Sequence, residues 1–210
     1  MPKNNIFIVI DGIDGSGKSE IVKMLHNYLF SKNKKYRILT TREPTNGTYG
    51  SRLREVLKSD KDPKSGSKML MDLFIKDRRE HLDKVILPFL NNSSNEEVHI
   101  AICDRYYYST IAFQGGQGID VQEIIRKNGD FRKPDIAFIL DLAPQVALER
   151  IKSRKKEKFE ELGFMERIRE NFLRLPEILG DNMRIIDSSG KFNVVFENIR
   201  KEVDKILKEI

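Results

Sequence analysis

The chain has 210 residues, and 39% of them are hydrophobic. It contains a single cysteine and has a formal net charge of +6 at pH 7. This length can bury a substantial core without metal or disulfide support, and one cysteine excludes an internal disulfide and favours a reducing compartment. No apolar stretch approaches the roughly 20 residues that a membrane helix needs, and the short polar start is not typical of a signal peptide. We therefore expect one cytoplasmic domain over residues 1–210, with no membrane partner.

Apolar runs and helical patterns alternate along the chain. The predicted elements, in chain order, are a strand at residues 6–10, a helix from residue 17, a strand at 36–41, helices at 49–57 and 66–90, a strand at 98–103, a helix at 121–127, a strand at 134–141, helices at 145–154 and 166–175, a strand at 183–186 and a terminal helix. Continuous apolar runs are typical of parallel strands buried on both faces. The predicted fold class is therefore α/β: a doubly wound parallel sheet of about five strands flanked by helices.

Two further expectations concern the core. Cys103 ends an apolar run and is expected to be a small buried side chain. The terminal helix has one apolar face, which we assign to the core because amphipathic helices bury such faces. The residues of this face are Phe192, Val195, Phe196, Ile199, Val203, Ile206, Leu207 and Ile210.

A glycine-rich segment joins the first predicted strand to the first predicted helix. It fits the pattern G-x-x-x-x-G-K-[ST], in which backbone N–H groups and a helix N-terminus bind phosphate. Its residues, all expected to contact ATP, are Gly12, Ile13, Asp14, Gly15, Ser16, Gly17, Lys18 and Ser19. Lys18 is expected to bridge the β and γ phosphates, and the Ser19 hydroxyl to bind Mg²⁺.

Two acids follow apolar runs and are candidates for a second Mg²⁺ ligand. Either Asp104 or Asp141 could hold the ion directly or through water. Asp104 is the better candidate because Arg105 follows it immediately. One strand end would then supply both a metal ligand and a phosphate ligand.

The phosphate-binding loop does not decide the function, because GTPases, transport ATPases, helicases and small-molecule kinases share it. Five motifs, however, follow one another in the order and spacing of one family. They are the loop itself, Arg42-Glu43-Pro44, Leu73-Phe74 with Arg78, Asp104-Arg105-Tyr106 and STIAFQG at residues 109–115. Over nearly its whole length the chain thus resembles the thymidylate kinases, which are P-loop nucleoside-monophosphate kinases.

This resemblance implies a P-loop NTPase type of fold, with a short mobile lid at about residues 150–160. It also implies ATP- and Mg²⁺-dependent phosphorylation of dTMP to dTDP for dTTP biosynthesis. The implied partners are ATP and dTMP, and the implied assembly is a homodimer.

The resemblance further implies a site for the acceptor nucleotide. Phe74 and Arg78 lie four residues apart on a predicted helix, so both can reach one pocket. Phe74 is implied to stack on the base and Arg78 to contact O4 of thymine. Arg105 is implied to hold the acceptor phosphate and Asp14 to meet the 3′-hydroxyl. The other implied acceptor contacts are Pro44 at the thymine methyl, Arg54 at the phosphate, and Thr110 and Gln114 at the base and sugar.

Phosphoryl transfer depends mainly on positioning and on cations at the transferring oxygens. Gly15 stands where some members of the family have arginine, which implies that the lid supplies the catalytic cation. The usual lid pattern resembles D-R-F-E, whereas this chain has Glu157-Lys158-Phe159-Glu160. The cation is therefore Lys158, Arg154 or Arg150. The expected catalytic residues are Lys18, Arg105, Arg154 and Lys158, and adenine is implied near residues 187–192.

Two other functions remain open at this point. The acceptor could be another nucleoside monophosphate or a nucleoside, although a nucleoside would not need Arg105 as a phosphate clamp. Alternatively, the positive charge could serve a nucleotide-switched protein that binds RNA or DNA. We find no basic stripe interleaved with aromatic residues, so no nucleic-acid partner is expected.

Overall fold

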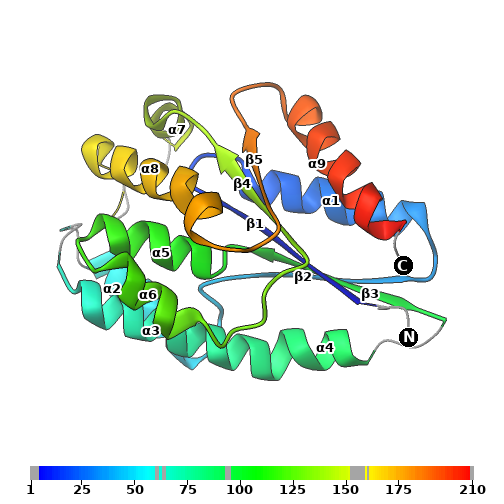
Figure 1. The fold of residues 1–210 in the computed structure, drawn as a ribbon, viewed down its shortest axis with the longest axis horizontal. Coiled ribbons are helices and arrows are strands. Elements are labelled where there is room, and N and C mark those ends of the chain that lie inside the picture. Colours follow the sequence, from blue (N-terminus) through cyan, green and yellow to red (C-terminus); the bar gives the residue numbers. More distant parts are fainter. Residues whose placement is uncertain are drawn as a thin grey trace.

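The computed structural model describes residues 5–59, 62, 65–92, 96–151, 159 and 161–208. Within these residues, five parallel strands form one sheet in the order β2-β3-β1-β4-β5 (Figure 1). The strands are β1 (Asn5–Gly12), β2 (Tyr36–Arg42), β3 (Val98–Asp104), β4 (Ile136–Asp141) and β5 (Met183–Asp187). The predicted doubly wound parallel sheet is confirmed, since the strand order extends outwards on both sides of β1.

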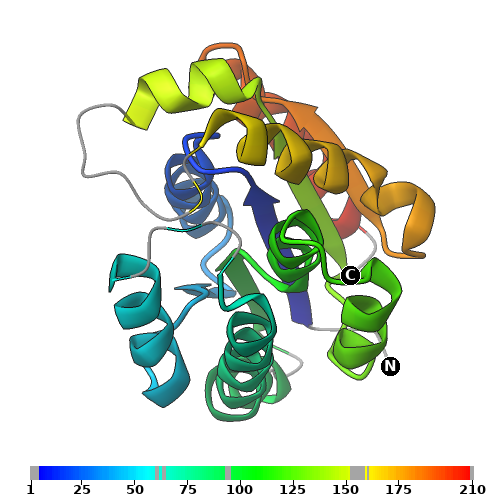
Figure 2. The same cartoon turned by 90° about the vertical axis from the view of Figure 1, so that its left-hand side faces the viewer.

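Helices cover both faces of the sheet. They are α1 (Lys18–Lys32), α2 (Thr48–Ser59), α3 (Ser67–His81), α4 (Leu87–Asn91), α5 (Tyr107–Gly116), α6 (Val121–Asn128), α7 (Pro144–Ile151), α8 (Leu162–Ile178) and α9 (Phe192–Leu207). Figures 1 and 2 show α1 and α9 together on one face, with the other helices opposite. None of the described helices is long and apolar enough to cross a bilayer.

The central strand β1 supplies side chains to two separate cores. Ile8 and Ile10 pack with α1 and α9, whereas Phe7 and Val9 pack with the helices of the opposite face. This alternation follows from the period of two along a strand, and it explains why β1 is apolar throughout. Cys103 lies in the second core with no exposed surface, as predicted.

The long helix predicted over residues 66–90 is interrupted. α3 continues into a π-helical turn, η1 (Leu82–Ile86), and then into α4. Pro88 is the second residue of α4 and directly follows Leu87, whose N–H bonds to the Leu82 carbonyl across the π-helical turn. The wider turn of a π-helix is thus a local feature that the apolar period did not predict.

The predicted core face of the last helix is partly wrong. Val195, Phe196, Ile199 and Val203 are buried, but 44% of Phe192 is exposed. Phe192 is the first residue of α9 and lies against the phosphate-binding loop instead of the core. The predicted residue Ile210, and the last part of the helix predicted at 145–154, lie outside the described residues.

The helix α5 was not predicted, because its N-terminus is capped by a distant residue. It has no side-chain cap of its own. Instead, Oδ2 of the buried Asp11 accepts hydrogen bonds from the N–H groups of Tyr106 at 3.1 Å and Ser109 at 3.0 Å. Asp11 Oδ1 accepts from the Ser109 hydroxyl at 2.7 Å and from the Gly12 N–H at 2.8 Å. The end of β1 therefore anchors α5.

We expect Asp11→Ala to lower the free energy of unfolding by about 3 kcal/mol, because it leaves buried N–H donors without an acceptor. The matched control is Asp120→Ala, since Asp120 caps the exposed start of α6 through the Gln122 N–H at 3.1 Å. That loss should be about 1 kcal/mol. Urea denaturation measures both, and equal losses would contradict the anchoring role of Asp11.

Candidate active site

A cleft of about 640 Å³ opens at the carboxyl ends of β1, β2 and β3. Carboxyl ends of parallel strands are the usual place for a ligand site in doubly wound sheets. Among the residues that line the cleft are Lys18, Ser19, Arg42, Asp104, Arg105 and Arg150. Cations from four separate elements therefore face one space, which suits a polyanionic ligand.

The glycine-rich loop between β1 and α1 is closely packed. Gly17 has a φ of 95°, and a Cβ added there would lie 2.6 Å from Cε1 of Phe192. The backbone conformation therefore favours glycine at this position, and a larger residue would also displace the Phe192 ring. Nζ of Lys18 donates to the carbonyl oxygens of Gly12 at 3.0 Å and Ile13 at 2.8 Å, so the lysine spans the loop.

Two expected Mg²⁺ ligands meet at the edge of this loop. The Ser19 hydroxyl donates to Oδ2 of Asp104 at 2.8 Å, and Oδ1 of Asp104 is buried without a hydrogen-bond partner. Carboxylate and hydroxyl oxygens are the ligands that Mg²⁺ prefers. The alternative, Asp141, has both oxygens bound by Arg169, at 2.6 and 2.9 Å. The geometry therefore favours Asp104 over Asp141.

Arg105 lies in a strained turn directly after β3. Its φ of 75° is the only positive φ of a non-glycine residue among the described residues. Such strain is retained where the surroundings enforce it, often at functional sites. Its guanidinium donates to Asp14 Oδ1, to Ser109 Oγ at 2.9 Å and to the Gly12 carbonyl at 3.3 Å. The two expected acceptor ligands, Asp14 and Arg105, are thus paired with each other.

Arg78 is almost completely buried between α3, α5 and α6. Nη2 forms an ion pair with Glu43 Oε2 at 2.8 Å and donates to Thr110 Oγ1 at 3.0 Å. Nη1 donates to Asn128 Oδ1 at 2.7 Å. The structure therefore brings the predicted pair Arg78 and Thr110 together, and adds Glu43 and Asn128 to them.

The other expected acceptor contacts lie on the same elements. Phe74 is half-buried on α3, one turn before Arg78, and Gln114 is buried on α5. Oε1 of Gln114 has no hydrogen-bond partner, an unusual state for a buried amide oxygen. Arg54 donates from Nη1 to the Pro44 carbonyl at 2.9 Å, so it holds the loop that follows β2.

The lid cations are described only in part. Nη1 of Arg150 lies 3.4 Å from the Gly15 carbonyl, and Nη2 lies 3.3 Å from the Ser188 carbonyl. Arg150, which alone of the three alternatives is among the described residues, thus lies at the cleft. Arg154 and Lys158 lie outside the described residues.

Sequence reasoning named Arg42 only as part of a motif, without a role, and did not name Asn128. Arg42 lines the cleft because β2 and β3 are in register, with Arg42 opposite Asp104. Its position at a strand end was the available signal. Asn128, at the end of α6, had no signal, since its contact with Arg78 depends on how two helices pack.

The chain matches a family model described as thymidylate kinase over residues 10–199. It is 37% identical to the probable thymidylate kinase of Thermococcus kodakarensis over 212 residues, which cover 97% of this chain and 100% of that protein. It is 36% identical to the thymidylate kinase of Desulfotalea psychrophila, over 96% of this chain and 95% of that protein. The thymidylate kinase of Leptospira interrogans is 38% identical, over 93% of this chain and 92% of that protein.

These matches extend over nearly the whole chain, and they include the loop and strand ends that line the cleft. The chain therefore belongs to the thymidylate kinase family, and it is a kinase.

Proposed function

We propose that this protein transfers the γ-phosphoryl group of ATP to dTMP with the help of Mg²⁺, and so supplies dTDP for dTTP synthesis. The observation that carries the proposal is the turn at Asp104 and Arg105. This turn directs one oxygen of the Asp104 carboxylate to the Ser19 hydroxyl and leaves the other oxygen buried without a hydrogen-bond partner. It also directs the guanidinium of Arg105 to Asp14. One turn thereby joins a metal ligand to a phosphate clamp, as a reaction between two bound nucleotides requires.

In the proposed reaction, an oxygen of the acceptor phosphate forms a bond to the γ-phosphorus of ATP. The bond between that phosphorus and the oxygen that bridges it to the β-phosphorus breaks, and ADP leaves. The loop amides and Lys18 bind the donor phosphates, and Arg105 holds the acceptor phosphate in line. Ser19 and Asp104 would hold Mg²⁺, which supplies charge neutralisation at the phosphates. Phe74 and Arg78 bind the base, with Pro44, Arg54, Thr110 and Gln114 around the nucleotide.

The further catalytic cation comes from the lid at residues 150–160, with Arg154 and Lys158 as the expected residues. Arg150 supports a lid of this kind, because it already contacts the loop carbonyl of Gly15. Adenine is proposed to bind near residues 187–192, where Phe192 forms part of the cleft wall.

A cytoplasmic, single-domain homodimer is part of the same proposal. The homodimer rests on the family resemblance alone. Nucleic acid is not proposed as a partner.

The first test is an ADP-release assay with ATP and Mg²⁺ that offers dTMP, dUMP, dCMP, dGMP, AMP and thymidine in parallel. We expect fast turnover of dTMP and slower turnover of dUMP, because one methyl group contributes only about 1–3 kcal/mol to discrimination. Turnover of thymidine at the rate of dTMP would contradict a monophosphate kinase. No turnover of any of the six acceptors, together with salt-dependent binding of RNA or DNA, would favour the alternative function of a nucleotide-switched binding protein.

The second test concerns the charge of Lys18. Burial, together with the nearby Arg105, lowers the pKa of Lys18 from its usual value to about 8. Bound phosphates favour the protonated amine, so ATP affinity should fall as the pH rises above about 8, by about tenfold per unit at the limit. Calorimetry in two buffers of different ionisation enthalpy should detect proton uptake on ATP binding at pH 8.5 but not at pH 6.5. Equal proton release at both pH values would contradict this.

The third test separates the two acids that were candidates for Mg²⁺. Asp104→Asn should raise the Mg²⁺ concentration for half-maximal activity by about 10-fold or more, since it removes the charge of a proposed metal ligand. Asp141→Asn is the matched control, because Arg169 already neutralises that carboxylate. Titration of activity with Mg²⁺ measures both variants. The Asp104 assignment fails if the Asp141 variant shows the larger shift.

A further inference from the structure

A buried polar chain connects β2 to α3 beside the proposed acceptor site. Nδ1 of His81 lies 3.2 Å from Oε1 of Glu43, and Nε2 of His81 lies 2.6 Å from Oγ1 of Thr41. Glu43 is 2% exposed and His81 is 3% exposed. An ionised carboxylate only accepts hydrogen bonds, so Nδ1 carries the proton and donates to Glu43, and in the neutral ring Nε2 accepts from Thr41. Glu43 thereby selects the tautomer, and the Thr41 hydroxyl completes the chain by donating to the other ring nitrogen.

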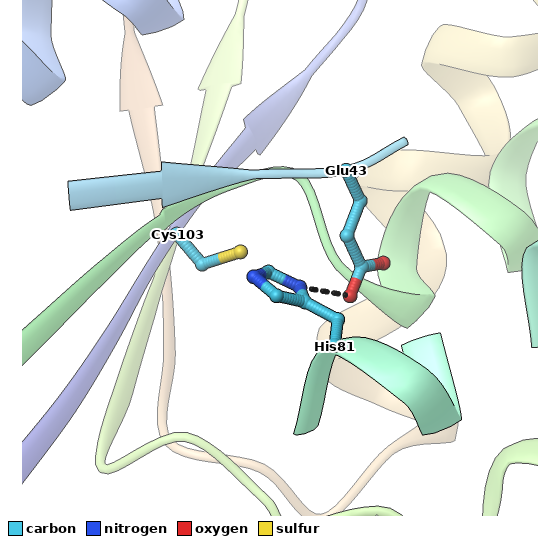
Figure 3. A group of neighbouring side chains, drawn as sticks. All are labelled: Glu43, His81 and Cys103. Carbon is cyan, nitrogen blue, oxygen red and sulfur yellow. Dashed lines mark hydrogen bonds and ion pairs between the residues drawn. The ribbon is translucent and has the colours of Figure 1, made fainter. Parts of the chain in front are cut away.

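Glu43 and His81 also form, with Cys103, a group whose ligand atoms all lie within 4.8 Å of one another. That spacing would suit a metal ion, but the orientation does not. Figure 3 shows the His81 ring between the other two side chains, with one nitrogen toward Glu43 and the other toward Cys103. The two ring nitrogens of His81 point in opposite directions. An ion bound to the nitrogen that faces Glu43 would be out of reach of Cys103, and an ion bound to the other nitrogen would be out of reach of Glu43.

The chemistry around the group also disfavours a cation. Burial raises the pKa of the Cys103 thiol well above its usual value, and the thiol donates to the Arg105 carbonyl at 3.0 Å. A metal ligand would have to be the thiolate. The guanidinium of Arg78, already paired with Glu43 at 2.8 Å, would in addition repel a metal ion. The group is therefore better explained by what it does to Arg78.

Arg78 and His81 are three residues apart on α3, so they lie on the same face of the helix. Arg78 contacts Oε2 of Glu43, and His81 contacts Oε1. Oε2 accepts no hydrogen bond, so its contact with Arg78 is an ion pair alone, and the contact of His81 with Oε1 is what orients the carboxylate beside the guanidinium. Nearby, Asp77 accepts from the N–H of Thr45 at 2.9 Å, which ties the segment after Glu43 to the same helix.

Glu43 is also the negative charge that neutralises Arg78. The guanidinium is almost fully buried, with its centre 5.2 Å and 5.6 Å from the ring centroids of Tyr106 and Phe131. Its Nε–H is buried without a hydrogen-bond partner. A buried cation that loses its carboxylate is strongly disfavoured and reorients toward water or another acceptor. The placement of the Arg78 guanidinium thus depends on the charge of Glu43, together with Thr110 and Asn128, which accept its hydrogen bonds.

We propose that Glu43, held by His81 and Thr41, is a positioning residue that directs Arg78 at the acceptor base and so sets the selectivity among acceptors. A guanidinium only donates, so a fixed Arg78 favours a base with a carbonyl at the contacted position over a base with an amino group. This inference rests on the proposed function, because it takes Arg78 as the residue that contacts the base.

The test compares two amides at position 81. The side-chain nitrogen of asparagine occupies nearly the position of Nδ1, whereas that of glutamine reaches the position of Nε2. His81→Asn therefore keeps a donor for Glu43, and His81→Gln loses it. We expect the acceptor KM to stay near that of wild type in His81→Asn and to rise by up to about 100-fold in His81→Gln, with the KM for ATP unchanged in both.

Glu43→Gln should raise the acceptor KM further and lower the ratio of dTMP to dCMP turnover. A role limited to filling space would give the opposite order at position 81, because asparagine leaves the larger cavity. Thermal unfolding of all variants separates loss of fold from loss of positioning. An acceptor KM that is the same in both His81 variants overturns the proposal.

Cys103→Ser tests the metal alternative, since serine keeps a donor for the Arg105 carbonyl but is a poor ligand for zinc. We expect an unchanged acceptor KM. One equivalent of zinc in the purified wild type, absent from Cys103→Ser, would overturn the proposal.

The acceptor KM is measured with whichever monophosphate the wild type prefers. A preference for a monophosphate other than dTMP rejects the proposed substrate, while the two His81 variants still decide the positioning role. If the wild type turns over none of the monophosphates, both proposals are overturned.

Discussion

The site depends on one buried carboxylate, that of Asp11 at the end of the central strand. Its oxygens bind the Gly12 N–H at the start of the phosphate-binding loop and the N–H groups at the start of α5. The loop proposed to bind ATP and the helix proposed to bind the acceptor nucleotide are therefore held by the same carboxylate. Burial raises the pKa of Asp11 while Arg105 opposes that rise, so the carboxylate and the clamp also interact through their charges. The positive φ of Arg105 is maintained because Asp11 fixes the residues that follow it.

Much of the fold could be predicted because its signals are local. Apolar runs predicted β1, β3 and β4, shorter segments predicted β2 and β5, and the glycine-rich loop predicted the junction of β1 and α1. The helix α5 was missed because its cap, Asp11, lies 95 residues before Tyr106. Phe192 was assigned to the core because helical spacing cannot distinguish an apolar side chain that packs on a loop from one that packs on the sheet.

The site was predictable to a similar extent. The motifs named both members of the pairs Ser19 with Asp104 and Asp14 with Arg105, since each residue stands at a strand end or in the loop. The surroundings of Arg78 were not predictable. Asn128 contacts Arg78 only because α3 packs on α6, and His81 contacts Glu43 only because α3 packs on β2. Contacts between elements that are distant along the chain leave no pattern that a single sequence shows. The roles assigned to the lid residues Arg154 and Lys158 stay predictions.

The pairing of Arg105 with Asp14 has a consequence for how charged ligands are received. A bare cationic patch attracts counterions, which an incoming phosphate must displace, so its affinity falls steeply as ionic strength rises. Here the guanidinium is already neutralised by a carboxylate of the same chain. An acceptor phosphate would exchange one anionic partner for another, with little net release of ions. The contribution of Arg105 to acceptor binding should therefore depend less on ionic strength than that of an unpaired cation. Inorganic phosphate should compete poorly, because it lacks the sugar whose 3′-hydroxyl would meet Asp14.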